Sequence, residues 1–171
     1  MERVRSGRSR SAPQVYYYLQ PAWSSHAIAV PEQEIAWCSY RGADEVSLSL
    51  LPAETNANRR LLGKVEPWRR NETVAGEYLL AGGGWESDLG IAAHSHSEIA
   101  FPLPSGSKTL SLAVALDRKV GEGGCVRCRI FADTLAGKEL WESDILRGSD
   151  EAKATGELDV EGLRQVILVT E

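Results

Sequence analysis

Short runs that alternate between apolar and polar residues, or that are apolar throughout, recur along most of the chain, and no run has the spacing of a long amphipathic helix. Alternation with a period of two residues is typical of a half-buried β-strand. Ten runs therefore predict strands, at residues 15–19, 35–40, 45–50, 77–80, 97–103, 109–116, 125–132, 138–143, 152–158 and 165–170. The segment at residues 51–62 has no clear pattern and fits either one helical turn or a loop.

Turn-forming segments rich in glycine, proline, serine and aspartate separate these runs. One of them, Ala-Gly-Gly-Gly at residues 81–84, suits a hairpin turn that needs positive φ. Many short strands with frequent turns predict an all-β domain, for which two packed sheets arranged as a jelly roll are the common solution. The first 14 residues, which include four arginines, are expected to form a disordered basic tail.

The composition is that of an ordinary globular protein, because 43% of the residues are hydrophobic and 25% are charged. The net charge of −5 argues against a general nucleic-acid-binding protein. No segment approaches the roughly 18 apolar residues that a membrane-spanning helix needs, and the basic tail lacks the apolar stretch of a signal peptide. We therefore expect neither a nucleic-acid partner nor a membrane span.

The cysteines of the sequence do not indicate a disulfide framework or a metal site. Three cysteines do not make a disulfide framework, and Cys38 has no neighbour of its kind in the sequence. Cys125 and Cys128 form a Cys-x-x-Cys pair, but residues three apart on one strand face opposite sides. They could share a metal ion only if the strand is broken, so Cys128 is interpreted as a small core residue.

Residues 90–103, with the sequence GIAAHSHSEIAFPL, contain two of the three histidines. Treated as one strand, this stretch turns Ser97, Ile99, Phe101 and Leu103 toward a core. His94, His96 and Glu98 then share the opposite face, where two histidines one residue apart suit a transition metal. A third ligand for such a metal is difficult to supply. Glu98 would have to reach it from the adjacent position on the same face, and the remaining histidine, His26, lies far upstream in the sequence. The alternative is a structural histidine beside a solvated strand face.

Other enzyme signatures are weak. The chain has no Gly-x-Ser-x-Gly nucleophile elbow, and its 24 acidic residues offer no distinctive pair for glycoside hydrolysis. A metal-dependent enzyme that uses His94, His96 and Glu98 is the remaining catalytic hypothesis. We expect the chain not to be an enzyme.

A set of spaced residues in the second half of the chain forms a further pattern: Gly90, His94, Ser97, Ile99, Phe101, Leu103, Asp117, Gly124, Val126, Cys128, Ile130, Asp133, Leu140, Ser143, Val160, Gly162, Val166, Leu168 and Thr170. In order and spacing this pattern resembles the NPCBM domain, a family of carbohydrate-binding modules first noticed beside glycoside hydrolases. The resemblance covers residues 48–171, and Ala115 stands where the family has a glycine. No single match is specific, but the order and spacing of the matches together are.

The resemblance implies a galactose-binding-like β-sandwich jelly roll at residues 48–171, with a β extension at residues 15–47 that packs on the sandwich or belongs to it. Members of the family normally continue beyond the position of Glu171 into a last strand, which we expect to be missing here. The resemblance also implies a non-catalytic module linked to other domains of a longer chain. It favours a location outside the cytoplasm, although the sequence itself does not settle this. Some sandwiches of the superfamily hold a structural calcium ion, and no other cofactor is expected.

Sugars bind against an aromatic ring with planar polar groups on their hydroxyls. The segment at residues 66–72, EPWRRNE, has this mixture in a predicted loop. The expected carbohydrate-binding residues are Trp68, Arg70, Asn71, Trp85 and His94. For Trp68, core packing and ligand contact are equally good interpretations, whereas Trp141 is expected in the core. The alternative to a sugar-binding module is a structural or protein-interaction domain with no sugar affinity.

Overall fold

The structure is a computed structural model that describes residues 3–5, 15–19, 26–35, 42, 44–53, 55–58, 67–80, 86–87, 89–148 and 150–171. It divides into two compact units, Met1–Glu45 and Val46–Glu171. Trp23, Trp37, Cys38 and most of the predicted strand at residues 35–40 lie outside the described residues. In the described part, no helix has both the length and the apolar character needed to cross a membrane.

The unit Met1–Glu45 contains an antiparallel sheet in the order β1 (Arg3–Arg5), β2 (Val15–Leu19) and β3 (Ile28–Pro31), followed by the 3-10 helix η1 (Glu32–Glu34). The strand predicted at residues 15–19 is confirmed as β2. β1 forms within the stretch expected to be a disordered tail, and it pairs with β2. None of the side chains whose exposure is described in this unit is buried, as expected where three strands form a single layer.

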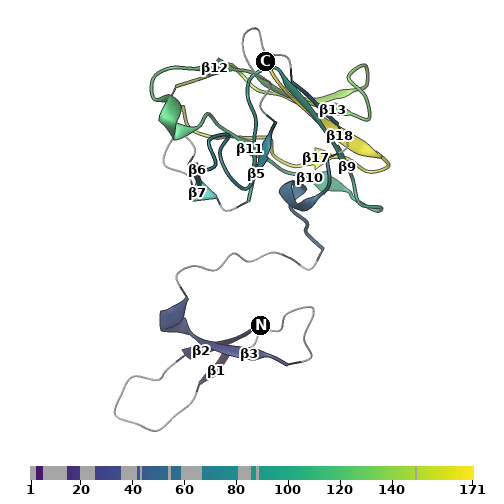
Figure 1. The fold of residues 1–171 in the computed structure, drawn as a ribbon. Helices are drawn as coiled ribbons and strands as arrows, with labels where there is room; N and C mark the ends of the chain where they lie inside the picture. The colour runs from purple at the N-terminus through teal and green to yellow at the C-terminus, as the bar shows by residue number, and fades with distance from the viewer. Residues whose placement is uncertain are drawn as a thin grey trace. The chain divides into compact units, whose positions relative to one another are not determined.

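The unit Val46–Glu171 is built on a five-stranded antiparallel sheet in the order β14-β13-β18-β9-β4 (Figure 1). Its strands are β4 (Thr55–Asn58), β9 (Ser97–Pro102), β13 (Cys128–Ala132), β14 (Glu139–Glu142) and β18 (Gln165–Thr170). The alternating and apolar runs predicted β9, β14 and β18 to within one residue at each end. β4 was missed because its sequence, Thr-Asn-Ala-Asn, is polar at three of four positions, and its hydrogen bonds to the edge of β9 make it a strand.

Short two-stranded pairs make up the rest of this unit. They are β5 (Arg69–Arg70) with β8 (Ile91–Ala92), β6 (Leu79–Leu80) with β7 (Glu86–Ser87), β10 (Thr109–Leu110) with β17 (Leu158–Asp159), β11 (Ala113–Val114) with β16 (Lys153–Ala154), and β12 (Cys125–Val126) with β15 (Leu146–Arg147). The predicted strands at residues 109–116 and 152–158 are each split in two. No α-helix occurs among the described residues, so the all-β prediction is confirmed.

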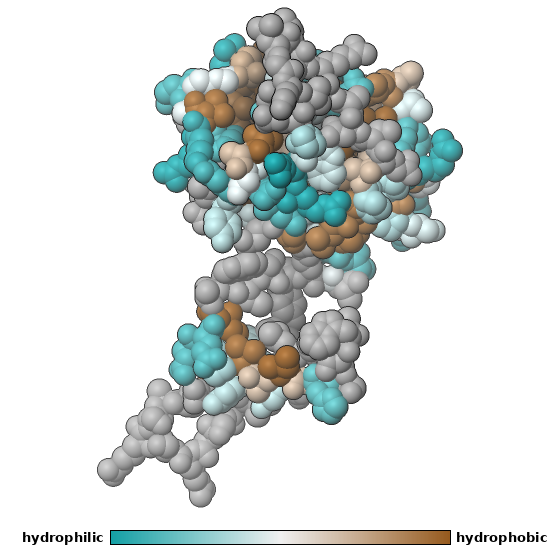
Figure 2. Space-filling model, viewed as in Figure 1, coloured by the Kyte–Doolittle hydropathy of each residue, from teal (hydrophilic) through white to brown (hydrophobic). Residues whose placement is uncertain are grey.

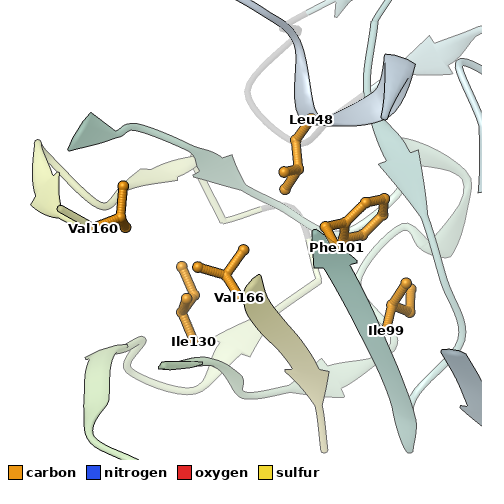
Figure 3. Packing of buried hydrophobic residues seen from close by; sticks show 6 residues of the cluster. All are labelled: Leu48, Ile99, Phe101, Ile130, Val160 and Val166. Atoms are coloured by element: carbon orange, nitrogen blue, oxygen red, sulfur yellow. The ribbon is translucent and has the colours of Figure 1, made fainter. Parts of the chain in front are cut away.

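The five-stranded sheet forms one layer of this unit and the short strand pairs form the other, and one hydrophobic cluster lies between them. The five-stranded sheet contributes Ile99, Phe101, Ile130 and Val166, which point toward Leu48 and Val160 (Figure 3). The short pairs pack against them with half-buried residues, among them Ile91, Leu110 and Leu158. The predicted inward face of residues 97–103 is confirmed, since Ser97, Ile99 and Phe101 are buried and Leu103 packs on the cluster. Trp141 also packs there, as expected.

The other face of the sheet is buried at its centre as well. Ala100, Phe131, Ile167 and Val169 form a second cluster there. The guanidinium carbon of Arg129 lies 4.7 Å from the centroid of the Phe131 ring. Glu139 and Glu171 pair with Arg129 and hold it in this position, so the charged side chain covers part of the aromatic ring.

The strand predicted at residues 45–50 is wrong. Leu48–Leu50 forms the 3-10 helix η2, in which the Leu50 N–H donates to the Ser47 carbonyl at 3.0 Å. The tight turn inserts Leu48 and Ser49 into the unit, with exposed fractions of 7% and 1%, while Leu50 is 53% exposed. A strand would have placed Leu48 and Leu50 on the same side.

Phe101 tests the main cluster, because its side chain is fully buried between the two layers. Phe101→Ala is expected to lower the free energy of unfolding by about 3–5 kcal/mol through lost burial and a cavity. Denaturant unfolding measures this loss. Leu135→Ala is the control, since Leu135 is 46% exposed and its replacement is expected to cost less than about 0.5 kcal/mol. Equal losses in the two variants would contradict the assignment of the core.

Candidate functional site

The candidate site begins at the end of the β5–β8 pair, where Arg69 lies opposite Ala92 and Arg70 opposite Ile91. Asn71 closes this end of the pair. Its backbone N–H donates to the Gly90 carbonyl at 2.9 Å, and its Oδ1 accepts from the Gly90 N–H at 3.0 Å. Asn71 has φ of 59°, in the left-handed region that asparagine tolerates better than most residues. Its carbonyl oxygen is therefore engaged in holding the strands together.

Trp68 combines the two roles considered for it. The indole packs against the main cluster and meets Phe101 edge to face, with ring centroids 5.6 Å apart and an interplanar angle of 70°. The guanidinium carbon of Arg70 lies over the indole, 5.4 Å from its centroid. The Nη2 of Arg70 donates to the Leu51 carbonyl at 2.9 Å. The tryptophan thus anchors an exposed arginine whose orientation is fixed at two points.

His94 lies two residues beyond β8, where the chain turns toward β9. Its carbonyl accepts hydrogen bonds from the hydroxyls of Ser97 at 2.7 Å and Thr170 at 2.6 Å. His96 follows with φ of 59°. These contacts tie the turn to the centre of the five-stranded sheet, and the imidazole of His94 is half-buried there.

The prediction of one continuous strand through residues 90–103 is wrong. The left-handed backbone at His96 breaks the alternation, and β9 begins only at Ser97. His94, His96 and Glu98 are all described, and neither they nor any other described residues form a group of three metal-ligating side chains. The metal-enzyme hypothesis therefore loses its ligand set.

The two described cysteines lie in different strand pairs. Cys125 is exposed on β12, and Cys128 is half-buried on β13. Burial raises the pKa of the Cys128 thiol from its ordinary value of 9.0 to about 11, because the thiolate loses its hydration there. Cys128 therefore stays protonated at neutral pH, which disfavours metal binding or nucleophilic chemistry.

Sequence reasoning missed Tyr78, which it placed in a predicted strand at residues 77–80. The observed strand β6 begins at Leu79, two residues after the predicted start, and the Tyr78 side chain is 81% exposed. Residues 72–78, here called the Tyr78 loop, form a turn closed by Thr73. The Thr73 N–H donates to the Glu77 carbonyl at 2.7 Å, and the Thr73 carbonyl accepts from the Gly76 N–H at 2.9 Å. A turn signal was present in the segment Asn-Glu-Thr-Val-Ala-Gly.

Of the five predicted site residues, the structure brings Trp68, Arg70 and Asn71 together at the β5–β8 pair. His94 lies just beyond β8. Trp85 lies outside the described residues, so its prediction has no structural counterpart here.

Comparison with known proteins assigns the chain to a family. The NPCBM/NEW2 domain matches the chain over residues 44–171. The chain belongs to this family. The resemblance drawn from the spaced motifs is thereby confirmed. No curated protein sequence matches the chain.

Solved structures of carbohydrate-binding modules from Clostridium perfringens share the fold of this NPCBM/NEW2 chain. One contains CBM51-2, in complex with GlcNAc, and INT domains of ZmpB, with 24% identity, a TM-score of 0.62, and coverage of 73% of this chain and 26% of that chain. Another is CBM51 from GH95 in complex with methyl-galactose, with 19% identity, a TM-score of 0.62, and coverage of 74% and 86%. These likenesses confirm the β-sandwich fold. The chain spans about a quarter of the first of these structures.

A third structure joins the M60 catalytic domain of ZmpB to CBM51-1 and CBM51-2. It has 20% identity and a TM-score of 0.62, and the match covers 93% of this chain and 16% of that chain. In that protein, modules of this fold occur beside a catalytic domain.

The clasp between Asn71 and Gly90 can be tested with a matched pair of variants. Asn71→Gly removes only the side-chain hydrogen bond and is expected to lower the free energy of unfolding by about 1 kcal/mol. Asn71→Ala also forces an alanine into the left-handed region, which adds about 1–2 kcal/mol. Denaturant unfolding of both variants measures the difference. If alanine is tolerated as well as glycine, the backbone at this position is not held as described.

Cysteine reactivity tests the burial of Cys128. At pH 8, iodoacetamide is expected to modify Cys125 within the folded protein and to leave Cys128 intact, because the Cys128 thiolate forms only as the pH approaches 11. Peptide mass mapping identifies the modified residues, and a sample unfolded in urea is the control in which both react. Equal modification of both residues in the folded protein would show that Cys128 is accessible.

Proposed function

We propose that this chain is a non-catalytic carbohydrate-binding module that works within a longer, multidomain protein. The observation that carries the proposal is the match of the NPCBM/NEW2 family over residues 44–171. Two structures with the same fold were solved in complex with GlcNAc and with methyl-galactose. A sugar ligand for this chain is inferred by analogy with those complexes. The residues on the surface of this chain support the inference.

That surface offers the groups that sugar recognition needs. Arg70 is exposed and fixed over the Trp68 ring, so its remaining N–H groups are already oriented for hydroxyl oxygens. In the proposed site, Trp68 and Asn71 position Arg70, and His94 lies at the edge. Trp85, which follows the glycine-rich segment, completes the set that the sequence indicates.

On the face of the unit Val46–Glu171 that Figure 2 shows, the apolar residues are arranged in a way that favours a small polar ligand over a large docking partner. In the face of the unit Val46–Glu171 shown in Figure 2, hydrophobic residues occur in several separate groups between hydrophilic ones. Protein-docking faces are typically contiguous apolar patches. A sugar instead needs a few convergent polar groups beside an aromatic ring.

No catalytic residue is assigned in this proposal. The described residues contain no group of three metal-ligating side chains, and the sequence offers no nucleophile elbow. The module is proposed to hold an attached domain near its glycan, outside the cytoplasm. A structural calcium ion stays a prediction from the family resemblance, which metal analysis of the purified chain would test.

A glycan array followed by isothermal titration calorimetry tests the proposal. The chain is expected to bind at least one glycan, and Arg70→Ala is expected to weaken that binding about tenfold or more through the loss of charge-assisted hydrogen bonds. Arg69→Ala is the matched control, because Arg69 is the exposed neighbour on β5 and pairs with Glu72 instead. Its affinity is expected to stay within twofold of the wild type.

Two outcomes would contradict the proposal. If the folded chain binds no glycan, the interaction-domain alternative is favoured. If it binds and both arginine variants behave alike, the site does not lie over Trp68.

A further inference from the structure

Tyr78 is the most exposed of the large hydrophobic side chains that the structure describes. Its exposed fraction is 81%, whereas the next, Val46, is 54% exposed. The other described aromatic residues of this unit are half-buried or buried. A single exposed apolar side chain is ordinary on a protein surface, so its meaning depends on how the ring is held and on what lies beside it.

The Tyr78 ring projects from a backbone that is fixed on both sides. Before it, Thr73 is only 3% exposed, and its hydroxyl accepts from the Glu77 N–H at 3.2 Å, in addition to the backbone bonds of the turn. After it, Leu79 packs against Gly90 so closely that a Cβ on Gly90 would lie 2.7 Å from the Leu79 Cδ1. A rigid backbone lowers the entropy cost of binding a ligand on the ring.

The residue before Tyr78 takes part in an exposed ion pair. Glu77, next to Tyr78 in the chain, pairs with Lys119 of the 3-10 helix η4 (Arg118–Val120). The two side chains are 48% and 60% exposed, and an ion pair in that position contributes little to stability. The ammonium has three donors, and the carboxylate accepts at up to four positions, so both retain capacity for further hydrogen bonds.

An aromatic face beside a donor and an acceptor fits a pyranose ring. The apolar C–H face of the sugar stacks on the aromatic ring, and its hydroxyls bond to the charged pair. The pair carries no net charge, and the chain as a whole carries −5. Because the pair offers a carboxylate or sulfate no excess positive charge, the area around Tyr78 favours a neutral sugar.

We propose that Tyr78 is a stacking platform for a neutral pyranose, with Glu77 and Lys119 as partners for its hydroxyl groups. The proposal rests on the proposed function, because it assigns a further contact area for the same kind of ligand. Gly90 connects the two areas, because it bonds to Asn71, which follows Arg70, and packs against Leu79, which follows Tyr78. A ligand longer than one sugar could thus contact both Arg70 and Tyr78.

Isothermal titration of the whole chain with the neutral oligosaccharide bound best on the array tests this assignment. Methyl-galactoside and GlcNAc serve as single-sugar probes, and a sulfated galactan serves as the anionic probe. Tyr78→Ala is expected to weaken binding of the neutral oligosaccharide about fivefold or more, while Tyr78→Phe, which keeps the stacking face, stays within twofold. Ile145→Ala is the control for loss of an exposed apolar side chain, since Ile145 is 41% exposed.

The outcomes separate this inference from the proposed function. If the wild type binds no sugar, both fail. If it binds and Arg70→Ala weakens binding while Tyr78→Ala does not, the inference alone is overturned. Preference for the sulfated galactan over the neutral oligosaccharide would also overturn it. Unchanged denaturation midpoints of the Tyr78 variants show that any loss of affinity comes from the surface.

Discussion

The whole sandwich depends on the antiparallel pairing of β18 with β9 on one side and β13 on the other. In this register, Val166 lies between Phe101 and Ala132, and it is fully buried. The next residue, Ile167, points to the opposite face and enters the second cluster. Successive residues of β18 are thus buried in the cluster on one face of the sheet and then in the cluster on the other. β18 therefore packs with both clusters and also hydrogen-bonds to both neighbouring strands. The ion pairs around Arg129 then shield the outer face where solvent would otherwise reach Phe131.

The second layer has a different character. It consists of two-residue pairs, which contribute half-buried residues to the main cluster and leave their connecting loops at the surface. Such short pairs depend on side-chain clasps, and Gly90 receives two: hydrogen bonds to Asn71 and close packing by Leu79. The absence of a Cβ at Gly90 permits that packing. The family fold therefore provides rigid positions for Arg70 and Tyr78 in a layer with little regular pairing.

The sequence predicted Gln165–Thr170 because a strand that is buried on both faces reads as a continuous apolar run, here Val-Ile-Leu-Val. It failed where a neighbour, and not the residue pattern, decides the conformation. The polar strand Thr55–Asn58 exists through its pairing with β9, and no rule of alternation predicts a left-handed backbone at His96. Trp68, Arg70 and Asn71 were grouped as a candidate site because they lie within four consecutive positions of the chain. The contact that each of the three residues makes was not predicted. These contacts depend on Phe101, Leu51 and Gly90, which come from distant segments of the chain.

The central place of β18 has a consequence for how this sandwich is made. β18 is the last strand of the sheet in the sequence, and its partners β9 and β13 are formed from residues that emerge from the ribosome well before it. Contacts between Phe101 and Val166 close a loop of more than sixty residues, a separation that slows folding. Until Gln165–Thr170 is available, the edges of β9 and β13 that face each other lack their hydrogen-bonding partner. The nascent chain is then exposed to association with other chains, and completion of one strand ends that risk.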